Sequence, residues 1–147
     1  MLDPHNMLAE VHPDLARVLR AASQAPVPFQ VTYGLRTLAA EEQAVASGHS
    51  QTLHSRHLAG GGGDPTHYGG ACCAVDVTPL CNPTTHQLDP NGVPDFNPAR
   101  GVENTYTLLS AQILQAAQAQ GVDVQWGGDW ITFKDWGHFQ LPWEGYP

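Results

Sequence analysis

The chain has 147 residues, 41% hydrophobic and 14% charged, which is the composition of one ordinary globular domain. Its formal net charge of -8, with only six Lys and Arg, excludes nucleic acid as an expected partner, because binding phosphates requires clustered cations. No apolar run approaches the roughly 20 residues that span a bilayer, so no membrane insertion is expected.

The N-terminal part shows two helical patterns around one strand. Residues 12–23 space their apolar side chains as a helix does. Residues 27–33 alternate apolar and polar side chains up to Tyr33, which predicts a strand with one buried face. Residues 37–48 predict a short helix, in which Glu41 favours the first turn because a negative charge complements the helix dipole there.

The middle of the chain combines a loop with a strand that carries an acid. Residues 48–70 include the run "GGGGDP" and show no apolar periodicity, so they predict a loop. Residues 72–80, "CCAVDVTPL", are rich in β-branched side chains and predict a strand. Asp76 stands between Val75 and Val77 and points to the opposite face, so it faces a cleft if the valines face the core.

The C-terminal part begins with the clearest helical pattern. Residues 104–121 place apolar side chains along one face and end on glycine. Short strands are predicted at 122–128, 130–134 and 137–141, separated by turns. Helices and strands follow in mixed order, which predicts an α+β fold: a small antiparallel sheet flanked by helices, in a single domain spanning residues 1–147.

Four side chains suggest a catalytic metal site. His57, Asp76 and His138 come from three separate elements and offer two imidazoles and one carboxylate, a set that suits zinc with a fourth position left for water. Asp135, three residues before His138, lies where it can take a proton from that water. Residue types alone do not exclude other sets of three metal ligands, because the chain has eight histidines.

A series of motifs along the chain makes the assignment more specific. In order, they are "VHPDLARVL", "FQVTYGLRTLAAEEQ", "GHSQTLHSRHLAG", "AVDV", "WGGDW" and "FKDWGHFQL". From about residue 11 to 141 this pattern resembles the zinc peptidases that include phage L-alanyl-D-glutamate peptidase endolysins and the D-alanyl-D-alanine carboxypeptidases and dipeptidases. The resemblance implies a hedgehog/D-Ala-D-Ala-peptidase-like fold and a Zn²⁺ cofactor.

The resemblance also implies residue roles. His57, Asp76 and His138 would be the zinc ligands, and Asp135 matches the catalytic acidic residue of the family. Arg36 in "GLRT" matches the family arginine that holds substrate and stabilises the charged intermediate, a role suited to a fixed guanidinium.

Four further residues are expected near the substrate. Ser55, two residues before the first ligand, and Gln43 in "EEQ" match family positions beside the substrate. Trp130 and Trp136 are aromatic neighbours of the expected metal and can line the substrate groove.

The glycine-rich segment is a departure from the family, whose members have few residues between the first histidine and the aspartate. We interpret about residues 60–73 as an inserted loop that leaves both ligands in place, because lengthening a loop costs only about 0.6 kcal/mol per doubling. His67 is a rival to His57 as ligand, although "SRHLAG" favours His57.

The remaining histidines and the cysteines have plainer interpretations. His49, His54 and His86 are expected to be solvated loop residues. Cys72, Cys73 and Cys81 are expected to be free thiols, and a structural zinc on these three with His67 is an alternative that adjacent cysteines disfavour.

Together these features predict a zinc metallopeptidase that hydrolyses an amide bond in the peptidoglycan stem peptide. The preferred interpretation is an L-alanyl-D-glutamate endopeptidase acting as a phage endolysin. The alternatives are a D-alanyl-D-alanine carboxypeptidase and a non-catalytic virion or wall-binding module. The N-terminal sequence lacks the pattern of a secretory signal, so we expect the protein to stay in the host cytoplasm until lysis and then to act on the wall. We also expect it to be a monomer.

Overall fold

Strand β2 (Ala74–Cys81) is the central strand of an antiparallel sheet. The computed structural model describes residues 1–96 and 103–147. The other strands are β1 (Phe29–Tyr33) and β5 (His138–Gln140) on either side of β2, β4 (Gln125–Trp126) beside β5, and β3 (Val93–Pro94) beside the end of β2. The predicted small antiparallel sheet is confirmed.

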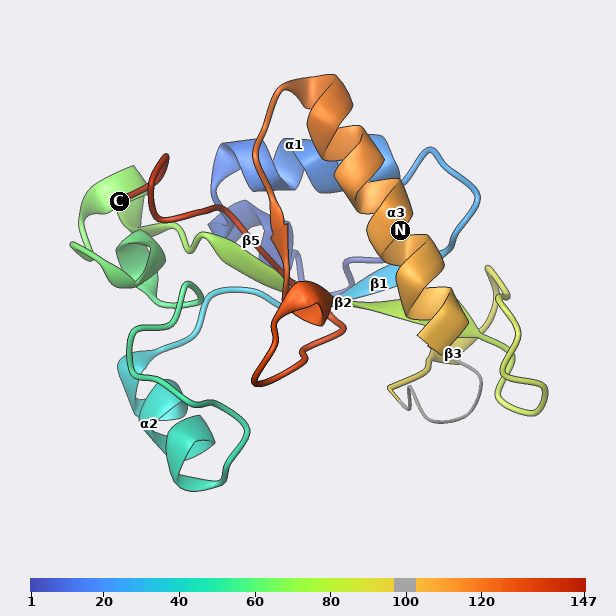
Figure 1. Ribbon diagram of the computed structural model, residues 1–147, viewed down its shortest axis with the longest axis horizontal. Helices are drawn as coiled ribbons and strands as arrows, with labels where there is room; N and C mark the ends of the chain where they lie inside the picture. Colours follow the sequence, from blue (N-terminus) through green and yellow to red (C-terminus); the bar gives the residue numbers. More distant parts are fainter. Residues whose placement is uncertain (97–102) are drawn as a thin grey trace.

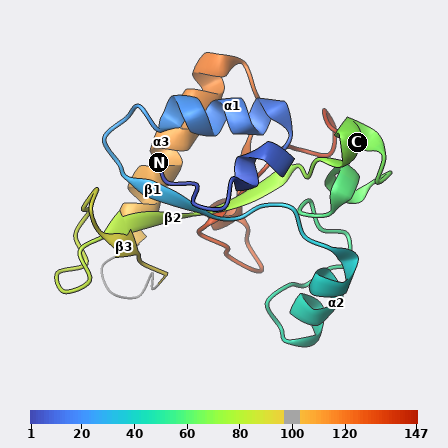
Figure 2. The same ribbon diagram turned by 180° about the vertical axis from the view of Figure 1, so that it is seen from behind.

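Two helices cover one side of the sheet, and a third lies on the other side (Figures 1 and 2). The pair is α1 (Pro13–Ala22) with α3 (Glu103–Gln120), and the third is α2 (Leu38–Ala46). Short 3-10 helices are η1 (Met7–Glu10), η2 (Ala59–Gly62), η3 (His67–Gly70) and η4 (Gly127–Asp129). No helix in the described part of the chain is long and apolar enough to cross a membrane.

The hydrophobic core lies between the helix pair and the sheet. Its fully buried side chains include Leu15 and Leu19 of α1, Leu109 and Ile113 of α3, and Phe29, Val31, Val75, Val77 and Phe139 of the strands. The periodicities marked most of these positions, but in α3 the pattern centred on Leu108, which is 46% exposed, whereas Leu109 is the buried leucine. The burial of one face of each element is what orders the fold.

Alternation along β2 gives the sheet a polar face opposite the core. Val75 and Val77 are fully buried, and Asp76 between them points to the other face, as predicted. The register pairs Asp76 with Tyr33 of β1 and with His138 of β5. Paired residues of antiparallel strands share a face, with Cβ atoms about 5 Å apart, so these three side chains form a row across the polar face.

The helix starts follow local signals in the sequence. Pro13 opens α1, and the ring of His12 accepts a hydrogen bond from the backbone N–H of Asp14. At the start of α2 the hydroxyl of Thr37 accepts one from the N–H of Ala40. All three predicted helices are confirmed, with bounds that agree to within two residues.

Two strand predictions were wrong in detail. Residues 130–134 form no strand, because β5 already pairs with β2 on one edge and with β4 on the other, and Ile131 is 97% exposed. Tyr33 does not join the buried face of β1. A register shift after Val31 turns Tyr33 to the polar face, where it is 37% exposed.

The glycine-rich segment packs more closely than a bulging insertion would. Gly60 and Gly61 are buried in η2 with φ near +63°, a left-handed conformation that favours glycine. Cys72 and Cys73 are fully buried core residues, and Cys72 pairs with Val11 in an isolated bridge. The expected insertion of about 60–73 therefore includes two residues that belong to the core.

The contacts of Gly61 predict a stability difference between two glycines of this segment. A Cβ at Gly61 would lie 2.7 Å from Cys73 Sγ, whereas a Cβ at Gly69, with a similar φ of +66°, meets nothing within 4 Å. Gly69→Ala should cost only about 1–2 kcal/mol of conformational strain. Gly61→Ala should add about 1–3 kcal/mol of overpacking, measured as the free energy of unfolding in denaturant. Equal losses would contradict the packing described for η2.

Candidate metal centre

Three side chains from distant parts of the chain meet on the polar face of the sheet. Asp76 and His138 are cross-strand neighbours, and His57 reaches them from the loop after α2. Asp76 Oδ1 lies 3.1 Å from His57 Nε2 and 3.1 Å from His138 Nδ1, and the two nitrogens are 3.2 Å apart. Both histidines are buried, so the three ligand atoms meet largely out of water.

Backbone bonds fix the loop that carries His57. Its backbone carbonyl accepts a hydrogen bond from the Arg36 N–H, and its ring Nδ1 donates to the Gly34 carbonyl, each at 2.8 Å. A carbonyl oxygen only accepts, so the proton of a neutral His57 is on Nδ1 and the lone pair on Nε2 faces the cluster. The first bond holds the backbone of His57 and the second holds its ring, both against the segment that follows β1.

A side-chain relay orients His138 in the same way. The amide nitrogen of Gln140 donates to Gln125 Oε1 at 2.9 Å, so its oxygen, Oε1, is the atom that faces His138 Nε2 at 2.9 Å. His138 Nε2 is therefore the donor, and the lone pair of a neutral ring is on Nδ1, toward Asp76. Partners of this kind are what orient metal-binding histidines in proteins.

The cluster has the chemistry and the dimensions of a metal site. Two imidazole lone pairs and a carboxylate oxygen point at one another at 3.1–3.2 Å, with neither neutral imidazole offering a proton. Ligand atoms about 2.0–2.1 Å from a tetrahedral zinc ion are separated by about 3.3 Å, close to these distances. Within the described residues, His57, Asp76 and His138 are the one group of this kind that can hold a metal ion.

The metal-free cluster shifts the pKa values of its members. Burial would raise the pKa of Asp76, but the two imidazoles beside it hold that pKa far below its usual range. Burial would lower the pKa of His138, but its hydrogen bond to Asp76 and the charge of that carboxylate raise it. A proton on His138 is thus the competitor that a metal ion has to displace.

Asp135 lies in the tight turn that leads into β5. Its backbone N–H donates to the Gly127 carbonyl at 3.1 Å, and its own carbonyl accepts from the His138 N–H at 3.3 Å. A Cβ at Gly127 would lie 2.5 Å from the Asp135 carbonyl oxygen, so this turn requires glycine there. Burial, and then the charge of Asp76, raise the pKa of Asp135, which suits a group that accepts and returns a proton.

A pocket of about 440 Å³ opens over the cluster. Four of the predicted site residues besides the three metal-site side chains line it: Arg36, Ser55, Trp130 and Asp135. The ring of Trp130 lies 5.0 Å from that of His138. Gln43 is exposed on α2 and outside the lining, and Trp136 lines a neighbouring pocket, so their predicted substrate contacts are not part of this cavity.

Arg36 is held by a buried carboxylate that sequence reasoning assigned another role. Its Nη1 donates to Glu41 Oε2 at 2.8 Å, and its guanidinium lies 4.5 Å from the centre of the Tyr33 ring. Glu41 is fully buried, although the sequence suggested only a favourable charge in the first helical turn. The sequence could not predict the pairing of Glu41 with Arg36, because a carboxylate five residues from an arginine pairs with it only if the intervening backbone turns back.

The second oxygen of Glu41 lacks a well-placed donor. Burial would raise the pKa of Glu41, but the hydroxyl of Ser50, the Arg36 guanidinium and the hydroxyl of Ser55 hold it below its usual value. Glu41 Oε1 is nevertheless buried without a hydrogen bond of good geometry. The ion pair with Arg36 therefore carries most of the stabilisation of this buried charge.

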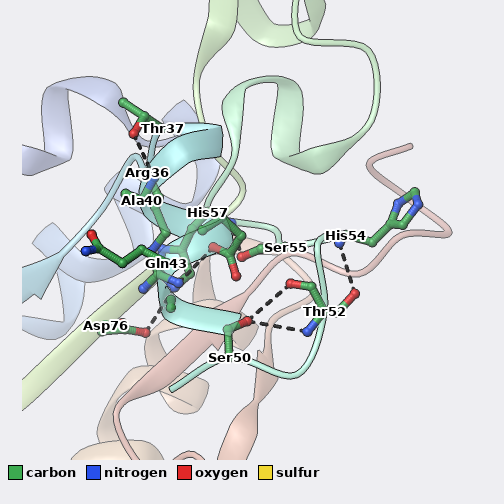
Figure 3. A network of polar contacts seen from close by, with 12 residues as sticks. Arg36, Thr37, Ala40, Gln43, Ser50, Thr52, His54, Ser55, His57 and Asp76 are labelled. Carbon is green, nitrogen blue, oxygen red and sulfur yellow. Dashed lines mark hydrogen bonds and ion pairs between the residues drawn. The ribbon is translucent and has the colours of Figure 1, made fainter. Parts of the chain in front are cut away.

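The loop over the pocket contains polar residues that the sequence did not single out. Figure 3 shows Ser50, Thr52 and His54 along one turn of this loop, where the Ser50 hydroxyl donates to the Thr52 carbonyl and the His54 N–H donates to the Thr52 hydroxyl. His49 and His54 are exposed, as predicted, yet both line the pocket. The ring of His54 points away from the ligand cluster. His86 is half-buried and bonds to Asp95, so the prediction that it is solvated was wrong.

The rival metal sites are not formed. His67 is exposed on η3, where its ring faces the Pro147 carbonyl, and it does not join the cluster. The four groups proposed for a structural zinc, His67, Cys72, Cys73 and Cys81, do not gather within the described chain. The three cysteines are buried free thiols, as expected, and burial raises the pKa of Cys72 to about 12.

Comparison with known proteins identifies the family. The sequence profile described as phage L-alanyl-D-glutamate peptidase matches residues 3–138. The chain belongs to this family. Among solved structures, the peptidase is similar to the L-Ala D-Glu endopeptidase ChiX of Serratia marcescens, with 37% identity, a TM-score of 0.73, and coverage of 96% of this chain and 87% of that chain. No curated protein is significantly similar to it.

Membership of this family makes the chain a peptidoglycan peptidase, a hydrolase, and confirms the predicted family and fold. The matched segment of the peptidase ends at His138, so it contains every side chain of the metal cluster.

The pKa of His138 predicts how metal affinity depends on pH. The metal needs a neutral ring, and the pKa of His138 is raised, so the affinity of the metal-free peptidase for Zn²⁺ should increase with pH through that pKa. The rise should approach about tenfold per pH unit for one displaced proton, measured by competition with a chelator of known affinity. His67→Ala should leave this profile unchanged, and a pH-independent affinity would contradict the described cluster.

The Arg36–Glu41 pair predicts a large difference between adjacent glutamates. Glu41→Ala leaves a mostly buried guanidinium without its counter-charge and should lower the free energy of unfolding by about 3–5 kcal/mol. Glu42→Ala, at the exposed neighbouring position, should change it by about 0.5 kcal/mol or less. Urea unfolding of both variants measures the difference, and similar values would rule out a buried ion pair.

Proposed function

We propose that the chain is a zinc-dependent endopeptidase that hydrolyses the L-alanyl-D-glutamate bond of the peptidoglycan stem peptide. The observation that carries the proposal is the meeting of three metal-binding atoms, from His57, Asp76 and His138, beneath a pocket. Two nitrogens and one oxygen form a ligand set that zinc accepts, leaving a coordination position for water or substrate. Membership of the family indicates which bond of the stem peptide is hydrolysed.

Zinc held by these three residues supplies Lewis acidity at neutral pH. The residues of the chain then divide the remaining tasks. His57 and His138 stay neutral and correctly turned because Gly34 and Gln140 accept their ring protons. Asp76 provides the negative charge that favours a divalent cation over a proton.

Asp135 is the proposed proton carrier. Its carboxylate accepts a proton from the attacking water and delivers it to the amine of D-glutamate as the amide bond breaks. Its raised pKa matches that task, since a carboxylate with an ordinary pKa returns a proton poorly near neutral pH. The turn through Gly127 fixes its backbone beside His138.

Arg36 is proposed to stabilise the negative charge that develops on the scissile carbonyl oxygen or on the substrate. The Glu41 carboxylate and the Tyr33 ring hold its guanidinium in one place, so little side-chain freedom is lost when substrate binds. Ser55 and Trp130 line the same pocket and are proposed substrate contacts. Gln43 and Trp136 lie outside this pocket, and their substrate contacts stay predictions from the sequence.

In its biological setting the protein is proposed to act as a phage endolysin. It would remain in the host cytoplasm until lysis and then reach peptidoglycan as a monomer, without a nucleic-acid partner. Its net charge of -8 supports the proposal that nucleic acid is not a partner.

Replacement of Asp135 tests the mechanism. Asp135→Asn removes the proton acceptor but no metal ligand, so the variant should keep its zinc and lose about 10²- to 10⁴-fold in kcat. Metal content by elemental analysis and digestion of purified peptidoglycan measure the two effects. Asp129→Asn, at an exposed aspartate outside the pocket, is the matched control and should retain activity.

Mass spectrometry of the released muropeptides names the bond that is cut. The proposal expects a new D-glutamate amino terminus on the released peptide. Release of terminal D-alanine alone would instead identify a carboxypeptidase. An unchanged rate in Asp135→Asn would remove Asp135 from the proton path.

A further inference from the structure

We infer that a second pocket beside the metal centre is a saccharide subsite, which holds the N-acetylmuramic acid residue attached to the L-alanine of the stem peptide. The inference rests on the proposed function and adds which side of the substrate lies in which pocket. It assigns a part of the cavity system that the hydrolytic mechanism leaves unused.

The second pocket continues the first across the metal centre. It has a volume of about 380 Å³, and Asp76, Phe133 and Asp135 line both cavities. A substrate whose scissile bond lies at the metal ligand Asp76 and at the proposed base Asp135 therefore extends into one pocket on its acyl side and into the other on its amine side. The two cavities are two halves of one substrate path.

The two pockets differ in character. The first carries cationic and polar side chains: Arg36, His49, Ser50, Gln51 and Thr52. The second contains five aromatic residues: Tyr33, Phe96, Tyr106, Phe133 and Trp136.

The substrate has the same asymmetry. On the amine side of the scissile bond, D-glutamate carries a carboxylate next to the leaving nitrogen, and the following stem residues add more. On the acyl side, L-alanine is joined through a lactyl group to an uncharged amino sugar. Carboxylates suit the guanidinium and imidazole groups of the first pocket, whereas the apolar C–H face of a sugar ring suits aromatic side chains.

Exposure of the aromatic rings supports a ligand rather than a structural role. Phe96 is 66% exposed and Tyr33 is 37% exposed, although both line the second pocket. Large apolar side chains that gather in a cavity with a polar rim mark a binding surface. Thr32 and Lys134 supply that rim, and the Lys134 ammonium uses one donor on the Gly128 carbonyl and has two more for sugar oxygens.

The experiment compares two substrates that differ only in the sugar. One, the free peptide, is the tetrapeptide beginning L-Ala-D-Glu with its amino terminus blocked as a lactyl amide, and the other is the same lactyl peptide on N-acetylglucosaminyl-N-acetylmuramic acid. The zinc-loaded wild type should have about a tenfold lower KM for the disaccharide peptide, as one or two stacking contacts provide. Phe96→Ala should raise that KM about tenfold and leave kcat/KM for the free peptide unchanged.

Leu108→Ala is the matched control, because Leu108 is an exposed apolar side chain on α3 outside both pockets. It should alter neither substrate's kinetics. Equal KM values of the wild type for both substrates would overturn the inference, and so would equal losses on both substrates in Phe96→Ala.

A binding measurement separates this inference from the catalytic proposal. N-acetylmuramyl-L-alanine titrated into the wild-type protein should shift the NMR signals of Tyr33 and Phe96, and Phe96→Ala should weaken its binding. Shifts confined to the cationic pocket would place the sugar on the opposite side and overturn the inference. If neither peptide is cleaved while the sugar compound still binds at Phe96, the proposed reaction fails and the saccharide site stands.

Discussion

Three acceptor atoms meet within 3.2 Å of one another in this protein, and such an arrangement is stable only around a positive charge. A proton on His138 Nδ1, favoured by the raised pKa of that ring, is one source of that charge, and a divalent cation is another. The Gly34 carbonyl and the side-chain oxygen of Gln140 accept the outer ring protons, so His57 Nε2 and His138 Nδ1 stay turned inward in either state. Metal binding therefore stabilises the folded chain, since the unfolded chain has no such cluster to offer.

The sequence was most informative where one short-range rule decides the outcome. Alternation in β2 placed Asp76 on the face opposite Val75 and Val77. Helical periodicity marked α1 and α3, and residues that favour helix ends marked α2. Convergence of the three ligands was different, because it depends on strand register and on a loop closing over the sheet. Only the family motifs, not the spacing of the residues, selected them from among other histidines and acids.

The errors share a physical cause: each depended on what else occupies the surroundings. Residues 130–134 have strand-like side chains, but both edges of the neighbouring β5 are already paired, with β2 and with β4. Glu41 has the sequence context of an exposed helix start, yet Arg36 folds back to neutralise it. Cys73 follows a run of glycines and still lies in the core, because Gly61 packs directly on its sulfur. Propensity reports local preference, whereas these positions are settled by tertiary packing.

The pairing of Asp76 with His138 across β2 and β5 also limits how the protein can diversify. A slip of one residue in that ladder would send a valine to the metal and the carboxylate into the core, so neither strand tolerates an insertion. His57 needs only its two anchors on the segment after β1, which leaves the loop before it free to change in length. Relatives with other peptide preferences can therefore arise, or be engineered, by exchanging that loop while the hydrolytic machinery is inherited intact.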